Sequence, residues 1–207
     1  MKLLVVAATK SEIQPTLNHF SCTGDRLLET EKFDILITGV GMVATAFALG
    51  QHLDANKYNT VVNVGIAGSF DRSMALGELV NVVTDTFAEL GAEDHDQFIS
   101  LPQLGFGEHT FHTSPTDIPN LKQVKAITVN KVHGNATSIA NTIKLYQPEI
   151  ESMEGAAVFY ACQQTNVAVL QVRSISNYVE PRNRENWKIG LAVDNLNSWL
   201  INYLTNL

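Results

Sequence analysis

The feature that most restricts the fold of this chain is a series of short apolar runs rich in valine, isoleucine and leucine. They occupy residues 2–8, 34–38, 60–64, 79–85, 125–130 and 167–172. Runs of this length and composition are typical of strands buried on both faces of a sheet. Because segments of helical length alternate with several of them, we predict an α/β fold, with residues 1–207 forming a single domain. A mixed twisted sheet would be flanked by helices, the last an amphipathic helix within residues 186–207.

Composition limits the classes of partner. The 207 residues carry a formal net charge of −7 and no Lys/Arg cluster, which argues against nucleic acid or an anionic membrane surface. No apolar run reaches membrane-spanning length, and the amino terminus lacks the features of a signal peptide, so a cytoplasmic location is expected. The two cysteines, Cys22 and Cys162, are too few for a disulfide scaffold and are interpreted as structural thiols.

Polar residues gather around the last apolar run. Arg173, Ser174, Ser176 and Asn177 come directly after it, and Glu154 stands at the beginning of the apolar helix before it. In open α/β sheets, ligands bind at the carboxyl ends of the strands, so we expect the chemistry here. A helix dipole favours a carboxylate at its amino end, which predicts that Glu154 keeps its charge.

A second carboxylate, Glu12, follows the first run. Thr9 and Glu12 have the spacing of a capping box, but Pro15 would then lie inside the helix. We therefore expect the helix to begin near Ser11, with Glu12 at the mouth of the preceding loop. On position alone, capping and catalysis remain equal alternatives for Glu12.

Two glycine-bearing segments, residues 39–41 and 65–69, are predicted to be tight turns after strands. Neither has the dinucleotide or P-loop spacing, so a nicotinamide cofactor or ATP is not indicated. Residues 91–119 are predicted to be irregular. Their His109 and His112 fit none of the stronger zinc patterns, and a solvated loop is favoured over a metal site. We expect neither metal nor organic cofactor.

Five segments of the chain form a recognisable set: KLLVVAATKSEI from Lys2, GVGM from Gly39, NVGIAG from Asn63, SMEGAA from Ser152 and VRSISN from Val172. With them, the chain resembles the purine nucleoside phosphorylase and nucleosidase superfamily over nearly its whole length. Residues 90–94, 132–135 and 176–183 are most similar to the futalosine hydrolases of menaquinone biosynthesis. Nucleosidases that cleave methylthioadenosine or adenosylhomocysteine, and purine nucleoside phosphorylases, remain alternatives.

The resemblance implies cleavage of the N-ribosidic bond of a purine nucleoside. It makes Glu12 the general base for water and Glu154 the acceptor for the ribose hydroxyls, near the positive charge that develops on the sugar. It also implies a homo-oligomer of two or more subunits. The substrate-binding residues it implies are Gly65, Ile66, Ala67, His133, Met153, Arg173, Ser176 and Trp187. Helix capping and a structural ion pair are the alternatives for Glu154 and Arg173.

Asn177 indicates the base. The adenine-cleaving relatives carry aspartate there, whereas an amide can donate to a 6-oxo group and accept from N7 once N7 is protonated. A 6-oxopurine such as hypoxanthine therefore fits better than adenine, although Asn177 could merely cap a turn. Trp187 and either Arg182 or Arg184 would suit the carboxyphenyl side of futalosine, with solvated loop charges as the alternative for the arginines.

Ile66 bears on the choice between water and phosphate. Phosphorylases of the superfamily carry serine or threonine at this position, and isoleucine offers no hydroxyl. Arg26 is the only arginine among the first 71 residues, so a strong phosphate clamp is not expected and water is the predicted nucleophile. A nucleoside-binding module without turnover is an alternative of another class, against which the presence of both Glu12 and Glu154 argues.

Overall fold

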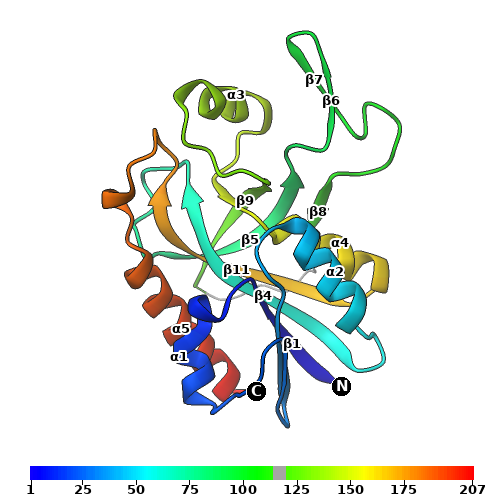
Figure 1. The fold of residues 1–207 in the computed structure, drawn as a ribbon, viewed down its shortest axis with the longest axis vertical. Coiled ribbons are helices and arrows are strands. Elements are labelled where there is room, and N and C mark those ends of the chain that lie inside the picture. Colours follow the sequence, from blue (N-terminus) through cyan, green and yellow to red (C-terminus); the bar gives the residue numbers. More distant parts are fainter. Residues whose placement is uncertain (114–119) are drawn as a thin grey trace.

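The computed structural model describes residues 1–113 and 120–207, which form a large sheet, a small hairpin and five helices (Figure 1). The strands are β1 (Lys2–Ala7), β2 (Leu27–Glu29), β3 (Phe33–Ile37), β4 (Tyr58–Ser69), β5 (Leu79–Phe87), β6 (Gly91–Asp94), β7 (Gln97–Ser100), β8 (Thr110–His112), β9 (Lys122–Thr128), β10 (Ile150–Ser152) and β11 (Ala168–Tyr178). The helices are α1 (Lys10–His19), α2 (Met42–His52), α3 (Ala136–Tyr146), α4 (Gly155–Thr165) and α5 (Ile189–Thr205), with a 3-10 turn at Arg184–Asn186.

The large sheet is mixed, as predicted. Its strand order is β10-β9-β5-β11-β4-β1-β3-β2, and β8 pairs with β5. Strands β3, β1, β4 and β11 are parallel to their neighbours in that run, whereas β2 and β5 join it antiparallel. Because β10 pairs with β4 as well as with β9, the part of the sheet from β4 to β10 closes on itself.

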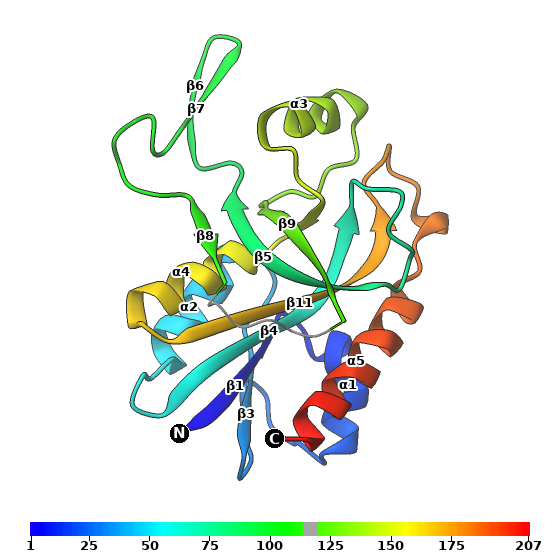
Figure 2. The same cartoon turned by 180° about the vertical axis from the view of Figure 1, so that it is seen from behind.

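Alternate residues of the central strands feed two apolar layers. In β1, Leu3 and Val5 face the layer that contains α1 and α5, whereas Leu4 and Val6 face the layer that contains α2 and α4. Figure 2 shows the two helix pairs on opposite sides of the sheet. Burial on both faces explains why the strands are continuous apolar runs, and the predicted architecture of a sheet flanked by helices is confirmed.

Two strands extend further than the sequence predicted. Residues 65–69, predicted to be a turn, belong to β4, and Arg173 to Asn177, predicted to follow a strand, belong to β11. The two strands remain paired from Ala168 opposite Thr60 to Tyr178 opposite Ser69, with a register shift between Ile175 and Asn177. The continuous ladder with a neighbouring strand overrides the glycines, which on their own favour a turn.

The prediction that residues 91–119 are irregular is wrong for much of its described part. Strands β6 and β7 form a hairpin that projects from the body, and β8 pairs with β5 (Figure 1). Apolar and polar residues alternate only weakly in these exposed strands, so they carry little periodic signal. Residues 114–119 of the segment lie outside the described residues.

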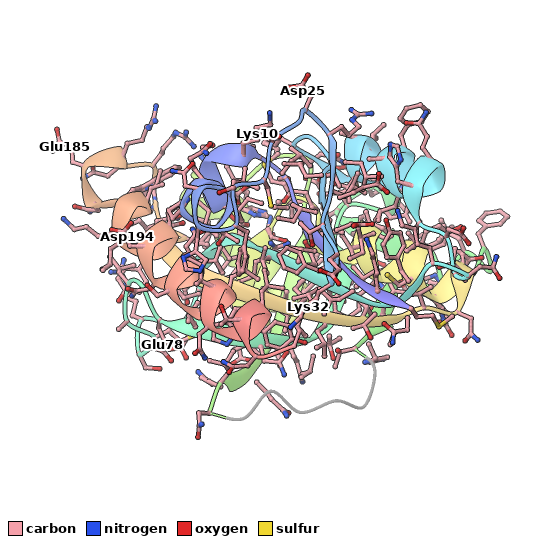
Figure 3. All side chains as sticks on the ribbon, turned by 90° about the horizontal axis from the view of Figure 1, so that it is seen from below. Lys10, Asp25, Lys32, Glu78, Glu185 and Asp194 are labelled. Atoms are coloured by element: carbon pink, nitrogen blue, oxygen red, sulfur yellow. The ribbon has the colours of Figure 1, made fainter. Side chains whose placement is uncertain are left out.

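Most charged side chains lie on the outside of the molecule. Lys10 pairs with Asp25 at 3.3 Å, and Figure 3 shows these two and Glu185 at the edge of the molecule. Across residues 1–113 and 120–207, the helices are too short or too polar to span a bilayer.

A buried carboxyl group interrupts the apolar interior. Asp85 of β5 accepts from Thr128 Oγ1 and Gln171 Nε2, both at 2.8 Å. Burial raises the pKa of Asp85 to about 6, although these hydrogen bonds and the charge of Arg173 act in the opposite direction. The folded protein therefore binds a proton here more tightly than the unfolded chain does.

This raised pKa predicts a specific dependence of stability on pH. The stabilising contribution of protonated Asp85 is fully present below the unfolded pKa, near 4, and is lost as the pH rises through about 6. Relative to Asp85→Asn, the wild type should lose roughly 3 kcal/mol of unfolding free energy between about pH 4 and pH 7. Urea titrations across this range measure the difference, and parallel profiles for the two proteins would contradict it.

Candidate functional site

A cavity of about 430 Å³ opens where β1, β4, β10 and β11 end, between the start of α1, the start of α4 and the segment before α5. Its walls include most of the predicted site residues, namely Glu12, Ile66, Ala67, His133, Met153, Glu154, Ser176, Asn177 and Trp187. Gly65 and Arg173 are the exceptions, and they lie directly beneath the wall. Residues from distant parts of the sequence are thus brought together in one site.

Glu12 both caps α1 and faces the cavity. The helix begins at Lys10 with Thr9 as its N-cap: Glu12 N donates to Thr9 Oγ1 at 3.4 Å, and Thr9 N donates to Glu12 Oε2 at 3.1 Å. The helix thus begins one residue before the predicted start near Ser11, and Thr9 is the N-cap although Pro15 lies inside the helix. The other oxygen, Oε1, accepts from Ile66 N at 3.2 Å. Capping and a place in the site are compatible, because the carboxylate uses a different oxygen for each.

A kink accommodates Pro15 inside α1. Ile13 has non-helical dihedrals, and Thr16 N, which in a regular helix would donate to Glu12 O, donates instead to Asn197 Oδ1 at 3.0 Å. Asn197 Nδ2 donates to Glu12 O at 2.8 Å. This buried amide of α5 thus replaces the lost helical bond and fixes the backbone of Glu12. Sequence reasoning missed it, although a polar residue beside Leu196 in an apolar stripe is a signal.

Glu154 is the N-cap of α4 rather than a residue of its first turn. Its Oε1 accepts from Gly41 N at 2.8 Å, and Gly41 is the N-cap of a different helix, α2. Gly41 has φ of 92°, so the turn before α2 needs glycine at this point. Burial raises the pKa of Glu154; Arg173 opposes that rise and the charge of Glu12 adds to it. Burial therefore outweighs the stabilisation of the Glu154 charge that was expected from the helix dipole.

Arg173 lies behind the two carboxylates. It is only 2% exposed, and a β-carbon at Gly65 would collide with its guanidinium and crowd Glu12. Glycine at position 65 thus leaves room for the guanidinium of Arg173. The predicted ligand contact is not what requires glycine at this position. Within the part of the chain that the structure describes, Arg173 Nε and Nη2 have no hydrogen-bond partner. Its charge acts on both Glu154 and Asp85.

Asn177 also lines the cavity. Its Oδ1 accepts from Ser176 Oγ at 2.8 Å, and its Nδ2 donates to Tyr178 O at 3.1 Å. An amide has two hydrogens and two lone pairs, so one donor and one acceptor position remain for a ligand. The carbonyl of Tyr178, which can only accept, fixes which end of the amide is which.

The segment before α5 forms the outer rim. Trp187 is half-buried, with the guanidinium carbons of Arg182 and Arg184 at 5.0 and 5.8 Å from its ring centre. An aromatic plate with two cations beside it suits an aryl group that bears a negative charge. Both arginines are exposed, and only Arg182 lines the cavity.

Metal ligands are not clustered in residues 1–113 and 120–207, where no group of three His, Cys, Asp or Glu side chains is placed to hold an ion. His112 lies 3.2 Å from Thr84 Oγ1 on the neighbouring strand, away from the cavity.

A match to the phosphorylase superfamily spans residues 28–202. The chain belongs to this superfamily. The predicted family is therefore confirmed.

The similar proteins include two kinds of nucleosidase. A futalosine hydrolase of Streptomyces coelicolor is 32% identical over 93% of this chain and 91% of its own length. Among solved structures, a 5′-methylthioadenosine/S-adenosylhomocysteine nucleosidase of Helicobacter pylori superposes with a TM-score of 0.86 at 17% identity, covering 100% of this chain and 99% of that one. Futalosine hydrolase of the same species gives 0.83 at 16% identity, with 100% and 98% covered. The two solved structures share the fold of this chain. The Streptomyces coelicolor relative confirms the predicted enzyme class, an N-glycosyl hydrolase.

The cavity wall holds a third carboxyl group that was not among the predicted site residues. Glu151 of β10 is 3% exposed and lines the wall between His133 and Gly68. The available signal was a charged residue that directly precedes the Ser-Met-Glu motif in an otherwise buried strand.

Proposed function

We propose that this enzyme hydrolyses the N-ribosidic bond of a 6-oxopurine nucleoside, and that its substrate is futalosine, which yields hypoxanthine and dehypoxanthinyl futalosine in menaquinone biosynthesis. The observation that carries the proposal is the pairing of two carboxylates, Glu12 and Glu154, with the amide of Asn177 on one cavity wall. The relatives named futalosine hydrolase support the choice of substrate.

Glu12, Glu154 and Asn177 each have one role in this reaction. As the bond from the sugar C1′ to the purine N9 breaks, its electron pair passes to the base and positive charge develops on the sugar. Glu154 faces the ribose hydroxyls and stabilises that charge, because its carboxylate is held by Gly41 N in a buried position. Water adds to C1′ and gives a proton to Glu12. The departing base, which has taken the electron pair, receives a proton from solvent at N7, and this N7–H donates to Asn177.

Water is favoured over phosphate by what surrounds Ile66. The backbone N–H of Ile66 could donate a hydrogen bond to a bound anion, but it already donates to Glu12. The two carboxylates on the same wall would repel a phosphate dianion, and Arg173 is buried behind them. A methylthioadenosine nucleosidase would share this hydrolytic chemistry, so the base and the 5′ group must be tested separately.

A panel of nucleosides tests the proposal. Purified enzyme in phosphate-free buffer is mixed with futalosine, inosine, methylthioadenosine or adenosylhomocysteine, and the released base is quantified. We expect kcat/KM to be highest for futalosine and higher for 6-oxopurines than for 6-aminopurines. Preference for methylthioadenosine would replace the proposal by the adenine-specific alternative, and release of no base from any nucleoside would favour a binding module.

The arginines at the rim predict how the 5′ group is bound. Arg182→Ala with Arg184→Ala should raise KM for futalosine by roughly 10–100-fold, since a charge-assisted contact with its carboxylate is lost. Inosine, which lacks that carboxylate, should be cleaved as before. Arg26→Ala, which changes an exposed arginine outside the cavity, is the matched control. Equal effects of the double substitution on both substrates would show that the arginines do not bind the 5′ group.

We also propose that the outer face of α2 and α4 is covered by a second copy of this chain. The two helices contact each other, contain no Asp, Glu, Lys or Arg, and leave Val43, Phe47 and Tyr160 exposed. Val43 and Tyr160 line an apolar groove of about 690 Å³. In a chain of net charge −7, a face without charges is one where two copies meet without repulsion.

Substitutions on this face predict the oligomeric state. Val43→Asp with Phe47→Asp should raise the dimer dissociation constant by about 100-fold or more, because each copy would bury unpaired charges. Sedimentation velocity over a range of concentrations measures this, with Asn141→Asp on α3 as a control of equal chemistry. A wild type that sediments as a monomer at every concentration would contradict the interface.

A further inference from the structure

Glu151 is a buried carboxylate on the cavity wall that the hydrolytic mechanism does not use. It lies opposite Gly68 in the antiparallel pairing of β10 with β4, and Asn177 lies opposite Gly68 on the other side, in the pairing of β11 with β4. A β-carbon at Gly68 would be 3.0 Å from Val179 Cγ2, 3.1 Å from Asn177 Nδ2 and 3.6 Å from Glu151 Cγ. The amide and the carboxylate thus lie close together over Gly68, and the absence of a side chain there leaves room for both.

His133 holds Glu151 through both oxygens. His133 N donates to Glu151 Oε1 at 3.0 Å, and Nδ1 is 2.6 Å from Oε2. On the other side of the ring, Nε2 is 2.8 Å from Thr142 Oγ1, so a neutral ring that donates from Nδ1 accepts from the Thr142 hydroxyl. Each carboxylate oxygen has a further lone pair, so Glu151 can accept a bond from a ligand in the cavity.

The two kinds of purine differ at N1, next to the 6 position. A 6-oxopurine carries a hydrogen on N1, whereas adenine presents a lone pair there. A carboxylate held in place accepts from the first and repels the second, and polar mismatch in a closed pocket discriminates strongly. The carboxylate cannot become a donor while it is charged, so it cannot adapt to the lone pair at N1 of adenine.

We propose that Glu151, oriented by His133, accepts a hydrogen bond from N1–H of the purine and is a main determinant of 6-oxopurine over 6-aminopurine specificity. This inference rests on the proposed function, in which Asn177 contacts the 6-oxo and N7 edge of the same base. Glu151 and Asn177 then contact adjacent positions of one purine ring from two strands on either side of β4.

The test removes the hydrogen from the ligand and, separately, the negative charge from the acceptor in the protein. Hypoxanthine and 1-deazahypoxanthine, which has C–H in place of N1–H, are compared as inhibitors of futalosine cleavage. In the wild type, the deaza analogue should bind roughly 10–100-fold more weakly, the usual loss for one hydrogen bond to a charged acceptor. In Glu151→Gln the acceptor is at most a neutral amide oxygen, so that ratio should fall by roughly 5–10-fold, and cleavage of 6-aminopurine nucleosides should rise relative to 6-oxopurines because the amide NH2 can donate to the lone pair of adenine N1.

Controls separate specificity from folding. Glu149→Gln changes a glutamate just before β10 that does not line the cavity, and should leave the wild-type ratio intact. The wild-type comparison does not depend on whether Glu151→Gln folds: equal binding of the two bases to wild type overturns the inference. So does an unchanged ratio in a folded Glu151→Gln, which would show a purely structural role. Failure of the proposed function itself looks different, because wild type would then release no hypoxanthine from futalosine.

Discussion

Glu12→Gln should lower kcat by about 10²–10⁴-fold, with little change in the affinity for nucleoside, because the general base for water is lost. Glutamine has one side-chain oxygen, which can still accept from Thr9 N, so the cap of α1 is preserved, whereas Ile66 N loses its acceptor. Single-turnover cleavage and equilibrium binding of a non-hydrolysed analogue measure the two effects. Glu31→Gln, an exposed acid away from the cavity, is the control.

The same variant distinguishes the two roles of Glu12. A role confined to capping predicts near-full activity, a wild-type pH profile and a lower melting temperature. Catalysis predicts the reverse combination, a near-native melting temperature with lost turnover. The first outcome would remove Glu12 from the mechanism.

Glu154→Gln should lower kcat for ribonucleosides by roughly 10²–10³-fold, because the carboxylate stabilises charge that develops only in the transition state. Burial raises the pKa of Glu154, and its protonated form is the inactive one. Wild-type kcat should therefore fall on acidification at a higher pH than an ordinary glutamate would give. The glutamine variant should lack that limb of the profile.

A substrate without the 2′-hydroxyl provides the control for Glu154. Wild type should cleave 2′-deoxyinosine more slowly than inosine relative to the uncatalysed rates, whereas Glu154→Gln should treat the two alike, since the group that contacts the hydroxyl is gone. If wild type were equally indifferent, Glu154 would not contact the ribose hydroxyls.

Local sequence signals predicted the architecture and much of the cavity wall because they coincide with the physical causes of the fold. The apolar run of β11 predicted a strand buried on both faces, and the Met-Glu and Arg-x-Ile-Ser motifs predicted Glu154 and Asn177, which line one cavity. The segment at Gly65 misled, because glycine there serves the close approach of Arg173 within a strand, and only the three-dimensional neighbour reveals that.

Long-range compensation explains the remaining differences. The helix start at Lys10 tolerates Pro15 because Asn197, far away in the sequence, replaces the broken bond at Glu12. Glu151 was overlooked because its importance comes from the pairing of β10 with Gly68, which no local pattern encodes. The importance of such residues can be recognised only once the strand register is known.

The most direct test is the mass balance of futalosine cleavage in phosphate-free buffer. Wild type should release hypoxanthine and dehypoxanthinyl futalosine in equal amounts, the sugar product having gained one water, and added phosphate should change neither the rate nor the products. Absence of hypoxanthine, or its release only with phosphate and with a sugar 1-phosphate as the second product, would contradict hydrolysis of a 6-oxopurine nucleoside at this site.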